Sequence, residues 1–151
     1  PRGVGIERLV QLDTNVDDLD PRVLPHVIDR LLDIGAVDAW ITPIVMKKGR
    51  AAFTVSALAA QEYADAVRDV LFLETSTIGI RTTEVERHSL DRRTSVVHVD
   101  GHAIAVKLAE RDGTVVNRSV EWDDVAGVAA ATGRPAKDVL AAAAALAREL
   151  S

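Results

Sequence analysis

The sequence of 151 residues contains no cysteine. Without a thiol, the chain cannot form a disulfide, bind a metal through thiolate, hold an iron–sulfur cluster or attack a substrate with a cysteine nucleophile. A chain without cysteine suits a reducing compartment, and we expect a cytoplasmic location.

Long apolar runs are also absent. The alanine-rich run at residues 141–146 is too short to cross a bilayer and is soon followed by Arg148 and Glu149. Hydrophobic residues still make up 48% of the chain, which is enough for a packed core. We therefore expect a globular protein that has no membrane partner.

Positive charge is in the minority, because 18 lysines and arginines stand against 23 acidic residues and the net charge is −5. No overall field draws such a chain to nucleic acid or anionic lipid, so neither is an expected partner. The stretch Lys47-Lys48-Gly49-Arg50 is a local exception, since three cations surround one glycine and no carboxylate stands beside them.

The common motifs of nucleotide and hydrolase sites are missing. The chain has no P-loop, no G-x-G-x-x-G and no G-x-S-x-G. No two of its four histidines share a predicted helix at the spacing of zinc ligands, and we interpret them as structural. No catalytic residue is predicted from these patterns.

The order of the predicted elements indicates an α+β fold. The elements are a strand at residues 7–13, a helix from Asp20-Pro21 to Gly35, strands at residues 36–46 and 53–57, a helix at residues 61–73, and a strand continuing towards Val85. This βαββαβ order is that of the ferredoxin-like fold.

The remaining residues predict a smaller module. Strands at residues 94–99 and 103–108 flank the turn Asp100-Gly101, a short strand is expected at residues 115–118, and two helices close the chain. We expect two domains: a ferredoxin-like domain over residues 1–91, and a small β-hairpin and two-helix module over residues 92–151.

Three connections meet at one end of a ferredoxin-like sheet: the exit of the first strand, the turn between the second and third strands, and the turn into the fourth. In this chain they are residues 15–18, 47–50 and 75–81. We expect residues 14–20 as a whole to form a turn. Pro43 cannot donate to a β-ladder, which fits the edge position of the second strand. The three segments predict one shared rim of carboxylates, cations and hydroxyls.

Such a rim suits a nucleoside triphosphate that carries a divalent cation. Lys47, Lys48 and Arg50 are candidates for the phosphate oxygens, and Gly49 lets backbone N–H groups approach the same ligand. Arg81 can reach inward from the fourth strand. Further hydroxyl and backbone donors come from Thr75, Ser76 and Thr77.

Two carboxylates of the rim, Asp17 and Asp18, are candidates for the metal. Each has a second interpretation, because an aspartate just before a helix often caps the free N–H groups of the first turn. The sequence leaves both interpretations open.

Four motifs resemble, in the same order, the C-terminal domain of the LarC family of nickel insertion proteins, which act in the lactate racemase cofactor pathway. They are Thr14-Asn15-Val16-Asp17-Asp18, Gly35-Ala36-Val37-Asp38, Thr42-Pro43-Ile44-Val45-Met46-Lys47-Lys48-Gly49-Arg50 and Glu74-Thr75-Ser76-Thr77-Ile78-Gly79-Ile80-Arg81. A later Val106-Lys107 strand and the closing helix pair also match, so the resemblance covers nearly the whole chain.

The resemblance implies a CTP-dependent cyclometallase, of the lyase or chelatase class, that places nickel into pyridinium-3,5-bisthiocarboxylic acid mononucleotide and so forms the nickel-pincer nucleotide. In that family the C-terminal domain binds CTP with a divalent metal and assembles into oligomers. The expected cofactors are therefore CTP with Mn or Mg, and nickel is the inserted metal. The expected partners are further copies of the chain and the N-terminal half of the same protein.

With the resemblance included, the expected site has two parts. The nucleotide is expected at Lys47, Lys48, Gly49, Arg50, Thr75, Ser76, Thr77, Gly79, Arg81 and Lys107. The divalent metal is expected at Asn15, Asp17 and Asp18.

Two departures from the family pattern stand out. Ala51-Ala52 replaces the usual proline and glycine, which bears on the hairpin tip, and residues 120–125 replace a Pro-Glu-Tyr-Glu-Asp-Cys-like stretch, which removes a thiol. The competing interpretation of the chain is a non-catalytic ferredoxin-like regulatory or oligomerisation module that senses a small anion.

Overall fold

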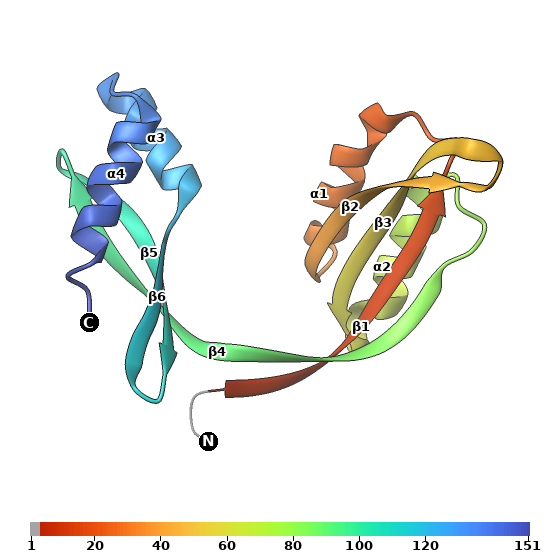
Figure 1. The fold of residues 1–151 in the computed structure, drawn as a ribbon, viewed down its shortest axis with the longest axis horizontal. Helices are drawn as coiled ribbons and strands as arrows, with labels where there is room; N and C mark the ends of the chain where they lie inside the picture. Colours follow the sequence, from red (N-terminus) through yellow and green to blue (C-terminus); the bar gives the residue numbers. More distant parts are fainter. Residues whose placement is uncertain (1–3) are drawn as a thin grey trace. The chain divides into compact units, whose positions relative to one another are not determined.

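The computed structural model describes residues 4–151 and divides the chain into two compact units. The first unit is Ile6–Arg87, and the second is His88–Ser151 together with Val4 and Gly5. Figure 1 shows the elements of each unit in chain order. No helix of the described chain is both long and apolar enough to cross a membrane.

The first unit is a sheet covered by two helices. Its elements are β1 (Val4–Val16), α1 (Leu24–Asp33), β2 (Ala36–Met46), β3 (Arg50–Ala60), α2 (Ala64–Glu74) and the first part of β4 (Arg81–Val99). The strand order β2-β3-β1-β4, with β3 antiparallel to both of its neighbours, confirms the ferredoxin-like fold and the edge position of β2.

The core of the first unit lies between the sheet and the helices. Val27 and Leu31 of α1 and Val67 and Leu71 of α2 are completely buried, and they join Leu12 of β1 in one apolar cluster. These helix positions follow the spacing of three and four residues that puts side chains on one face. Burial of this face fixes α1 and α2 on the sheet.

The approach to α1 begins as predicted at Asp20. Its carboxylate accepts a hydrogen bond of 3.0 Å from the Arg22 backbone N–H, and Pro21 opens a short 3₁₀ turn, Pro21–Val23, ahead of the helix. The Arg22 guanidinium, and then its backbone N–H, hold the pKa of the Asp20 carboxyl below its ordinary value. Asp20 therefore caps the 3₁₀ turn that leads into α1.

The predicted turn at residues 14–20 is wrong for its first three residues. Thr14, Asn15 and Val16 continue β1 and pair with Val55, Thr54 and Phe53 of β3. Thr14 and Val16 are buried, so the alternation of inward and outward side chains extends beyond the short strand expected from the apolar residues. The turn itself starts at Asp17.

The second unit packs two helices on a three-stranded antiparallel sheet. Its elements are the second part of β4, β5 (His102–Arg111), β6 (Thr114–Val120), α3 (Trp122–Thr132) and α4 (Ala136–Ala147). Asp100 and Gly101 both have positive φ, of 52° and 80°, in the predicted turn. Ile104, Val106 and Leu108 of β5 are buried against Val125 and Val139 of the helices.

The expectation of separate strands near Val85 and from Thr94 is wrong, because β4 runs unbroken from Arg81 to Val99. Residues 86–93 are strongly charged, which hid the strand pattern. Some of these charges have partners on neighbouring strands: Arg87 pairs with Glu7 of β1, and Arg93 pairs with Glu110 of β5 at 2.6 Å. Cross-strand ion pairs of this kind support a strand that has no apolar alternation.

Candidate functional site

A pocket of about 440 Å³ opens in the first unit where β1 and β2 end and β4 begins. It is lined by Asn15, Asp17 and Asp18 at the end of β1, by Met46 at the end of β2, and by Ser76, Thr77, Ile78, Gly79 and Arg81 of the segment that leads into β4. The structure thus brings together three segments that lie far apart in the sequence. We call this opening the rim pocket.

Asn15 is held from both neighbouring strands. Its Oδ1 accepts a hydrogen bond of 2.8 Å from the Thr54 hydroxyl of β3 and one of 3.0 Å from Nη2 of Arg81, the first residue of β4. The contact with Thr54 follows from the sheet register, in which Asn15 and Thr54 are directly opposite. One carboxamide oxygen therefore connects three strands at the mouth of the pocket.

The two carboxylates are each tied to a different segment. Nη1 of Arg50 donates to Oδ2 of Asp17 at 3.1 Å, which forms an ion pair between the start of β3 and the turn after β1. The Ser76 hydroxyl donates to Oδ1 of Asp18. No backbone N–H of the described chain donates to either carboxylate, so neither of them acts as a helix cap in this structure.

The segment between α2 and β4 is ordered by its own hydroxyls. The Thr75 hydroxyl donates to the carbonyl of Leu71 at 2.6 Å and accepts from the Thr77 backbone N–H at 3.2 Å. The hydroxyls of Thr77 and of the buried Thr14 contact each other, and each oxygen lies 2.9 Å from the carbonyl oxygen of Gly79. Because each hydroxyl has one proton, one of them donates to the other and the second donates to the carbonyl. A hydroxyl-rich sequence therefore folds back onto β1.

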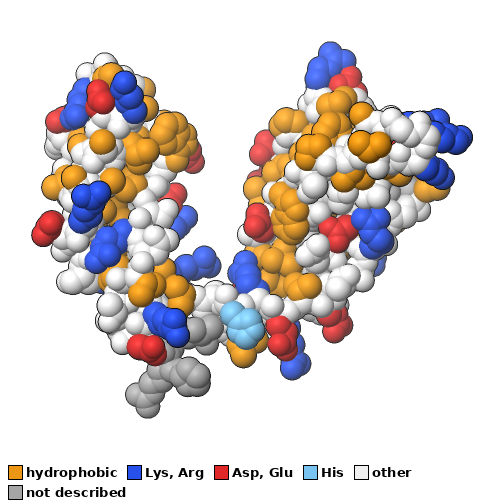
Figure 2. All heavy atoms as spheres, viewed as in Figure 1, with side chains coloured by type: hydrophobic (Ala, Val, Ile, Leu, Met, Phe, Trp, Pro, Cys, Tyr) orange, Lys and Arg blue, Asp and Glu red, His pale blue; other side chains and the backbone are white. Residues whose placement is uncertain are grey.

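The cationic turn lies beside the rim pocket, directly after Met46. Lys47, Lys48 and Gly49 form a three-residue turn between Met46 and Arg50, which pair across β2 and β3. Gly49 has a positive φ, of 68°, and Lys48 also adopts a left-handed conformation, with φ of 65°. Figure 2 shows lysine and arginine side chains gathered at this hairpin tip.

The expected residues fall into three groups. Those that line the rim pocket are Asn15, Asp17, Asp18, Ser76, Thr77, Gly79 and Arg81. Those that lie next to it on the same segments are Lys47, Lys48, Gly49, Arg50 and Thr75. Lys107 belongs to β5 of the second unit, where its ammonium pairs with Glu121 at 2.6 Å.

Sequence reasoning missed the apolar wall of the pocket. Ile78 is completely exposed to solvent, yet it lines the pocket together with Met46. The sequence does contain a signal for this wall. Ile78 is an apolar residue within the polar run Ser76-Thr77-Ile78-Gly79, and an apolar side chain in a polar connection is a candidate for ligand contact. Such a wall suits a flat, partly apolar ligand group.

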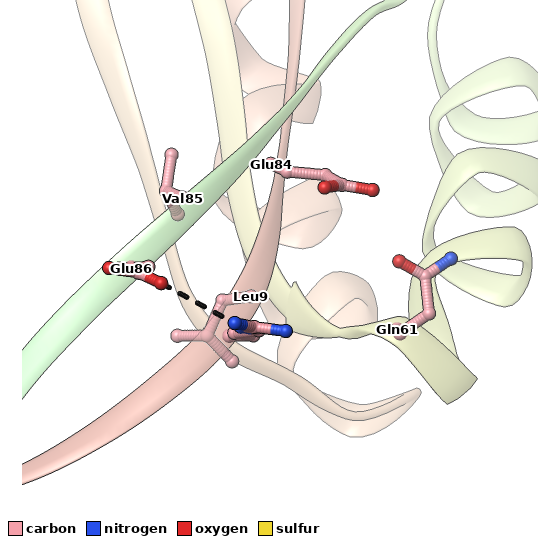
Figure 3. A pocket seen from close by; sticks show the side chains of 6 residues that line it. Leu9, Gln61, Glu84, Val85 and Glu86 are labelled. Atoms are coloured by element: carbon pink, nitrogen blue, oxygen red, sulfur yellow. Dashed lines mark ion pairs between the residues drawn. The ribbon is translucent and has the colours of Figure 1, made fainter.

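A second opening of about 430 Å³ lies over β1 and β4 (Figure 3). It is lined by Arg8, Leu9, Gln61, Glu84, Val85 and Glu86. Its arginine, Arg8, is paired with Glu86 at 3.6 Å, the contact that is dashed in the figure. Because none of the expected residues lines it and its cation faces a carboxylate, we assign the candidate site to the rim pocket.

The rim pocket does not resemble a site for a tightly held transition metal. The described residues contain no cluster of three or more histidine, cysteine, aspartate or glutamate side chains that could hold a metal ion. All four histidines are exposed, and none lines the pocket. The arrangement instead combines cations, hydroxyls and two carboxylates, which are groups that bind an anion and a hard cation together.

The family model and the curated proteins that match this chain both describe nickel insertion proteins. Residues 2–140 match the family model described as nickel insertion protein. The chain is 56% identical, over 137 residues, to the pyridinium-3,5-bisthiocarboxylic acid mononucleotide nickel insertion protein of Nocardioides sp.. It is 36% identical, over 133 residues, to the protein of the same name from Thermotoga petrophila.

These matches cover most of this chain but a minor part of the relatives. They span 91% of the chain and 35% of the Nocardioides protein, and 88% of the chain and 34% of the Thermotoga protein. The chain therefore corresponds to about a third of the length of the curated relatives that it matches.

Solved structures show the same fold. LarC2, the C-terminal domain of a cyclometallase involved in synthesis of the NPN cofactor of lactate racemase, superposes with a TM-score of 0.86 at 28% identity, covering 96% of this chain and 99% of that one. A protein from Methanopyrus kandleri superposes with a TM-score of 0.65 at 26% identity, covering 97% and 90%. Both units thus have counterparts in each of these structures.

Proposed function

Because the chain belongs to the nickel insertion protein family, we propose that it is the nucleotide-binding part of an enzyme that inserts nickel into pyridinium-3,5-bisthiocarboxylic acid mononucleotide to give the nickel-pincer nucleotide. The observation that carries this proposal is the rim pocket, where cations, hydroxyls and two carboxylates converge from three segments. In the proposed reaction, CTP is the nucleotide, and nickel is a substrate that is transferred.

The triphosphate is proposed to lie along the cationic side of the rim pocket. Lys47 and Lys48 are exposed, and no carboxylate of the described chain pairs with either ammonium. Arg50 donates one hydrogen bond to Asp17, and its other N–H groups are available to a phosphate oxygen. These groups supply charge-assisted hydrogen bonds of the kind that phosphate prefers.

A divalent cation fits the remaining oxygens of the same pocket. Asp17 uses Oδ2 for Arg50 and Asp18 uses Oδ1 for Ser76, so within residues 4–151 the other oxygen of each carboxylate has no hydrogen-bond partner. One or two carboxylates, with phosphate oxygens and water, are the usual protein ligands of Mg²⁺ beside a nucleotide. Asp17 and Asp18 are therefore proposed to hold Mg²⁺ or Mn²⁺, which would neutralise phosphate charge.

The CTP proposal is tested by thermal unfolding. We expect CTP with Mn²⁺ to raise the melting temperature by several degrees, because a ligand at 100 times its Kd stabilises the folded protein by about 2.7 kcal/mol. Excess chelator should remove most of the shift. Lys48→Ala should reduce it, whereas Lys137→Ala on α4, an exposed lysine of the second unit, should leave it unchanged.

Two outcomes would contradict the proposal. Equal shifts with any phosphate compound would favour a module that senses small anions. No shift with CTP at all would remove the nucleotide from the function of this chain.

A further inference from the structure

The orientation of the Asn15 carboxamide is determined by its neighbours. A guanidinium has only donors, so the Asn15 atom that lies 3.0 Å from Arg81 Nη2 must be the oxygen. The same oxygen accepts from the Thr54 hydroxyl at 2.8 Å. Rotation of the amide by half a turn would place its NH₂ group against the guanidinium and is therefore disfavoured.

The Asn15 NH₂ group is consequently the free end of the side chain. It has no hydrogen-bond partner in the part of the chain that the structure describes. No buried side-chain nitrogen or oxygen of these residues lacks a partner, so the NH₂ group must be accessible to solvent. Asn15 lines the rim pocket, and the pocket is where this group can meet a ligand.

We propose that Asn15 is a hydrogen-bond donor to the ligand of the rim pocket, positioned by Arg81 and Thr54, and is not a ligand of the divalent metal. The inference rests on the proposed function for the identity of the ligand as a nucleotide. The group recognised is an oxygen or ring nitrogen that accepts a hydrogen bond, on either the base or the phosphates. Of the three expected metal ligands, Asp17 and Asp18 then remain.

The two roles need different atoms of the carboxamide: a metal ion binds a free lone pair of the oxygen, whereas a hydrogen-bond donor uses an N–H of the NH₂ group. Both lone-pair directions of Asn15 Oδ1 are already used by Thr54 and Arg81. A metal ion at this oxygen would also stand beside the Arg81 guanidinium, with which it shares the sign of its charge. The NH₂ group has neither obstacle, and an oxygen-rich ligand complements it.

The substitution Asn15→Asp separates the two roles because they predict opposite changes in the affinity for CTP with Mn²⁺. Aspartate keeps an acceptor for Arg81 and Thr54, so the strand contacts persist, but it replaces the free NH₂ by an anionic oxygen. If Asn15 is a donor, Kd for CTP with Mn²⁺ should rise by about 10- to 100-fold, since a hydrogen bond is lost and repulsion is added. If Asn15 is a metal ligand, the added charge should tighten metal-dependent binding.

The experiment is a calorimetric titration of the folded wild-type chain and its variants with CTP and with inorganic tripolyphosphate, each with Mn²⁺. Asn117→Asp on β6 is the matched control, since it makes the same charge change in the second unit. It should leave both affinities unchanged. Weaker binding of both ligands by Asn15→Asp would place the donor at the phosphates, and weaker binding of CTP alone would place it at the nucleoside.

Failure of this inference is distinguishable from failure of the proposed function. If the wild-type chain binds CTP but Asn15→Asp binds it equally well or more tightly, Asn15 is not a donor and the nucleotide site stands. If the wild-type chain binds neither CTP nor tripolyphosphate, both the proposed function and this inference are overturned. A circular dichroism spectrum matching that of the wild type verifies that Asn15→Asp is folded.

Discussion

At the scale of single residues, Asp17 and Asp18 differ in how firmly they are held. The Asp17 side chain is 21% exposed and is fixed by the Arg50 guanidinium, whereas Asp18 is exposed and accepts one hydroxyl. If Asp17 holds the proposed cation, that cation will weaken the attraction between the Asp17 carboxylate and the Arg50 guanidinium and will make the guanidinium more available to phosphate. Metal and nucleotide should therefore favour each other's binding beyond their own chelation.

The metal role predicts a selective effect of Asp17→Asn and Asp18→Asn. An amide oxygen can still accept from Arg50 or Ser76, so the fold should persist. The loss of the negative charge should weaken the binding of a hard divalent cation. We expect the Mn²⁺-dependent part of the CTP affinity to fall by about tenfold in each variant. Titrations with Mn²⁺ and with chelator measure this part directly.

The control for these variants is Asp29→Asn, an exposed aspartate of α1 outside the rim pocket. It should retain the full metal dependence. If Asp17→Asn and Asp18→Asn also retain it, the metal is held by phosphate oxygens and water alone, and the carboxylates serve only to anchor Arg50 and Ser76.

The sequence predicts which kinds of side chain line the rim, but it does not predict which atoms bond to one another and which remain available to a ligand. The cationic turn and the hydroxyl run are local patterns, so the sequence alone identifies them. The contacts Arg50–Asp17, Ser76–Asp18 and Arg81–Asn15 join residues 33 to 66 positions apart, and they depend on the register of β1 and β3. Which carboxylate oxygen stays free, and that Asn15 presents its NH₂ group, follow only from those contacts.

At the scale of elements, the junction between α1 and β2 depends on Gly35. Its φ of 111° is a conformation that other residues rarely adopt, and an added Cβ would lie 2.7 Å from the Tyr63 ring. α1 can therefore end and β2 can begin within two residues only if this position carries no side chain.

Two glycine substitutions are expected to have opposite signs. Gly35→Ala should lower the free energy of unfolding by about 1–3 kcal/mol, because of its backbone strain and the contact with Tyr63. Gly127→Ala should raise it by about 0.5–1 kcal/mol, because Gly127 lies inside α3 and an added Cβ meets nothing within 4 Å. Urea denaturation measures both, and a stabilising Gly35→Ala would show that the junction is not strained.

The elements that sequence patterns predicted well have local end signals. Asp20-Pro21 and Gly35 mark α1, and Gly133, with φ of 72°, ends α3. The middle of β4 has no such signal, because its side chains are mostly charged and some of them pair with charges on neighbouring strands. A pattern based on apolar alternation could not recognise it.

At the scale of the whole molecule, residues 4–151 contain two separate apolar cores. One contains Leu71 among the residues of the first unit, the other contains Leu108 among those of the second, and the two clusters share no member. We propose that each core unfolds as its own cooperative unit, with β4 contributing a different part to each.

Hydrogen exchange can test the two-core proposal. Leu71 and Leu108 are both completely buried, and replacing either by alanine should cost about 2–5 kcal/mol. Leu71→Ala should accelerate amide exchange in β2, β3 and the start of β4, whereas Leu108→Ala should accelerate it in β5, α3 and the end of β4. Equal acceleration across the described chain in both variants would show a single cooperative unit instead.

The buried hydroxyl of Thr14 has a spectroscopic consequence. Its oxygen contacts the Thr77 hydroxyl, lies 2.9 Å from the carbonyl oxygen of Gly79 and is inaccessible to water. Whichever of these two groups accepts the Thr14 proton, that proton should exchange slowly enough to give a separate resonance in a proton NMR spectrum. The chemical shift of that proton depends on the position of the segment between α2 and β4. A single natural side chain thus offers an unlabelled probe of ligand-induced movement at the rim pocket.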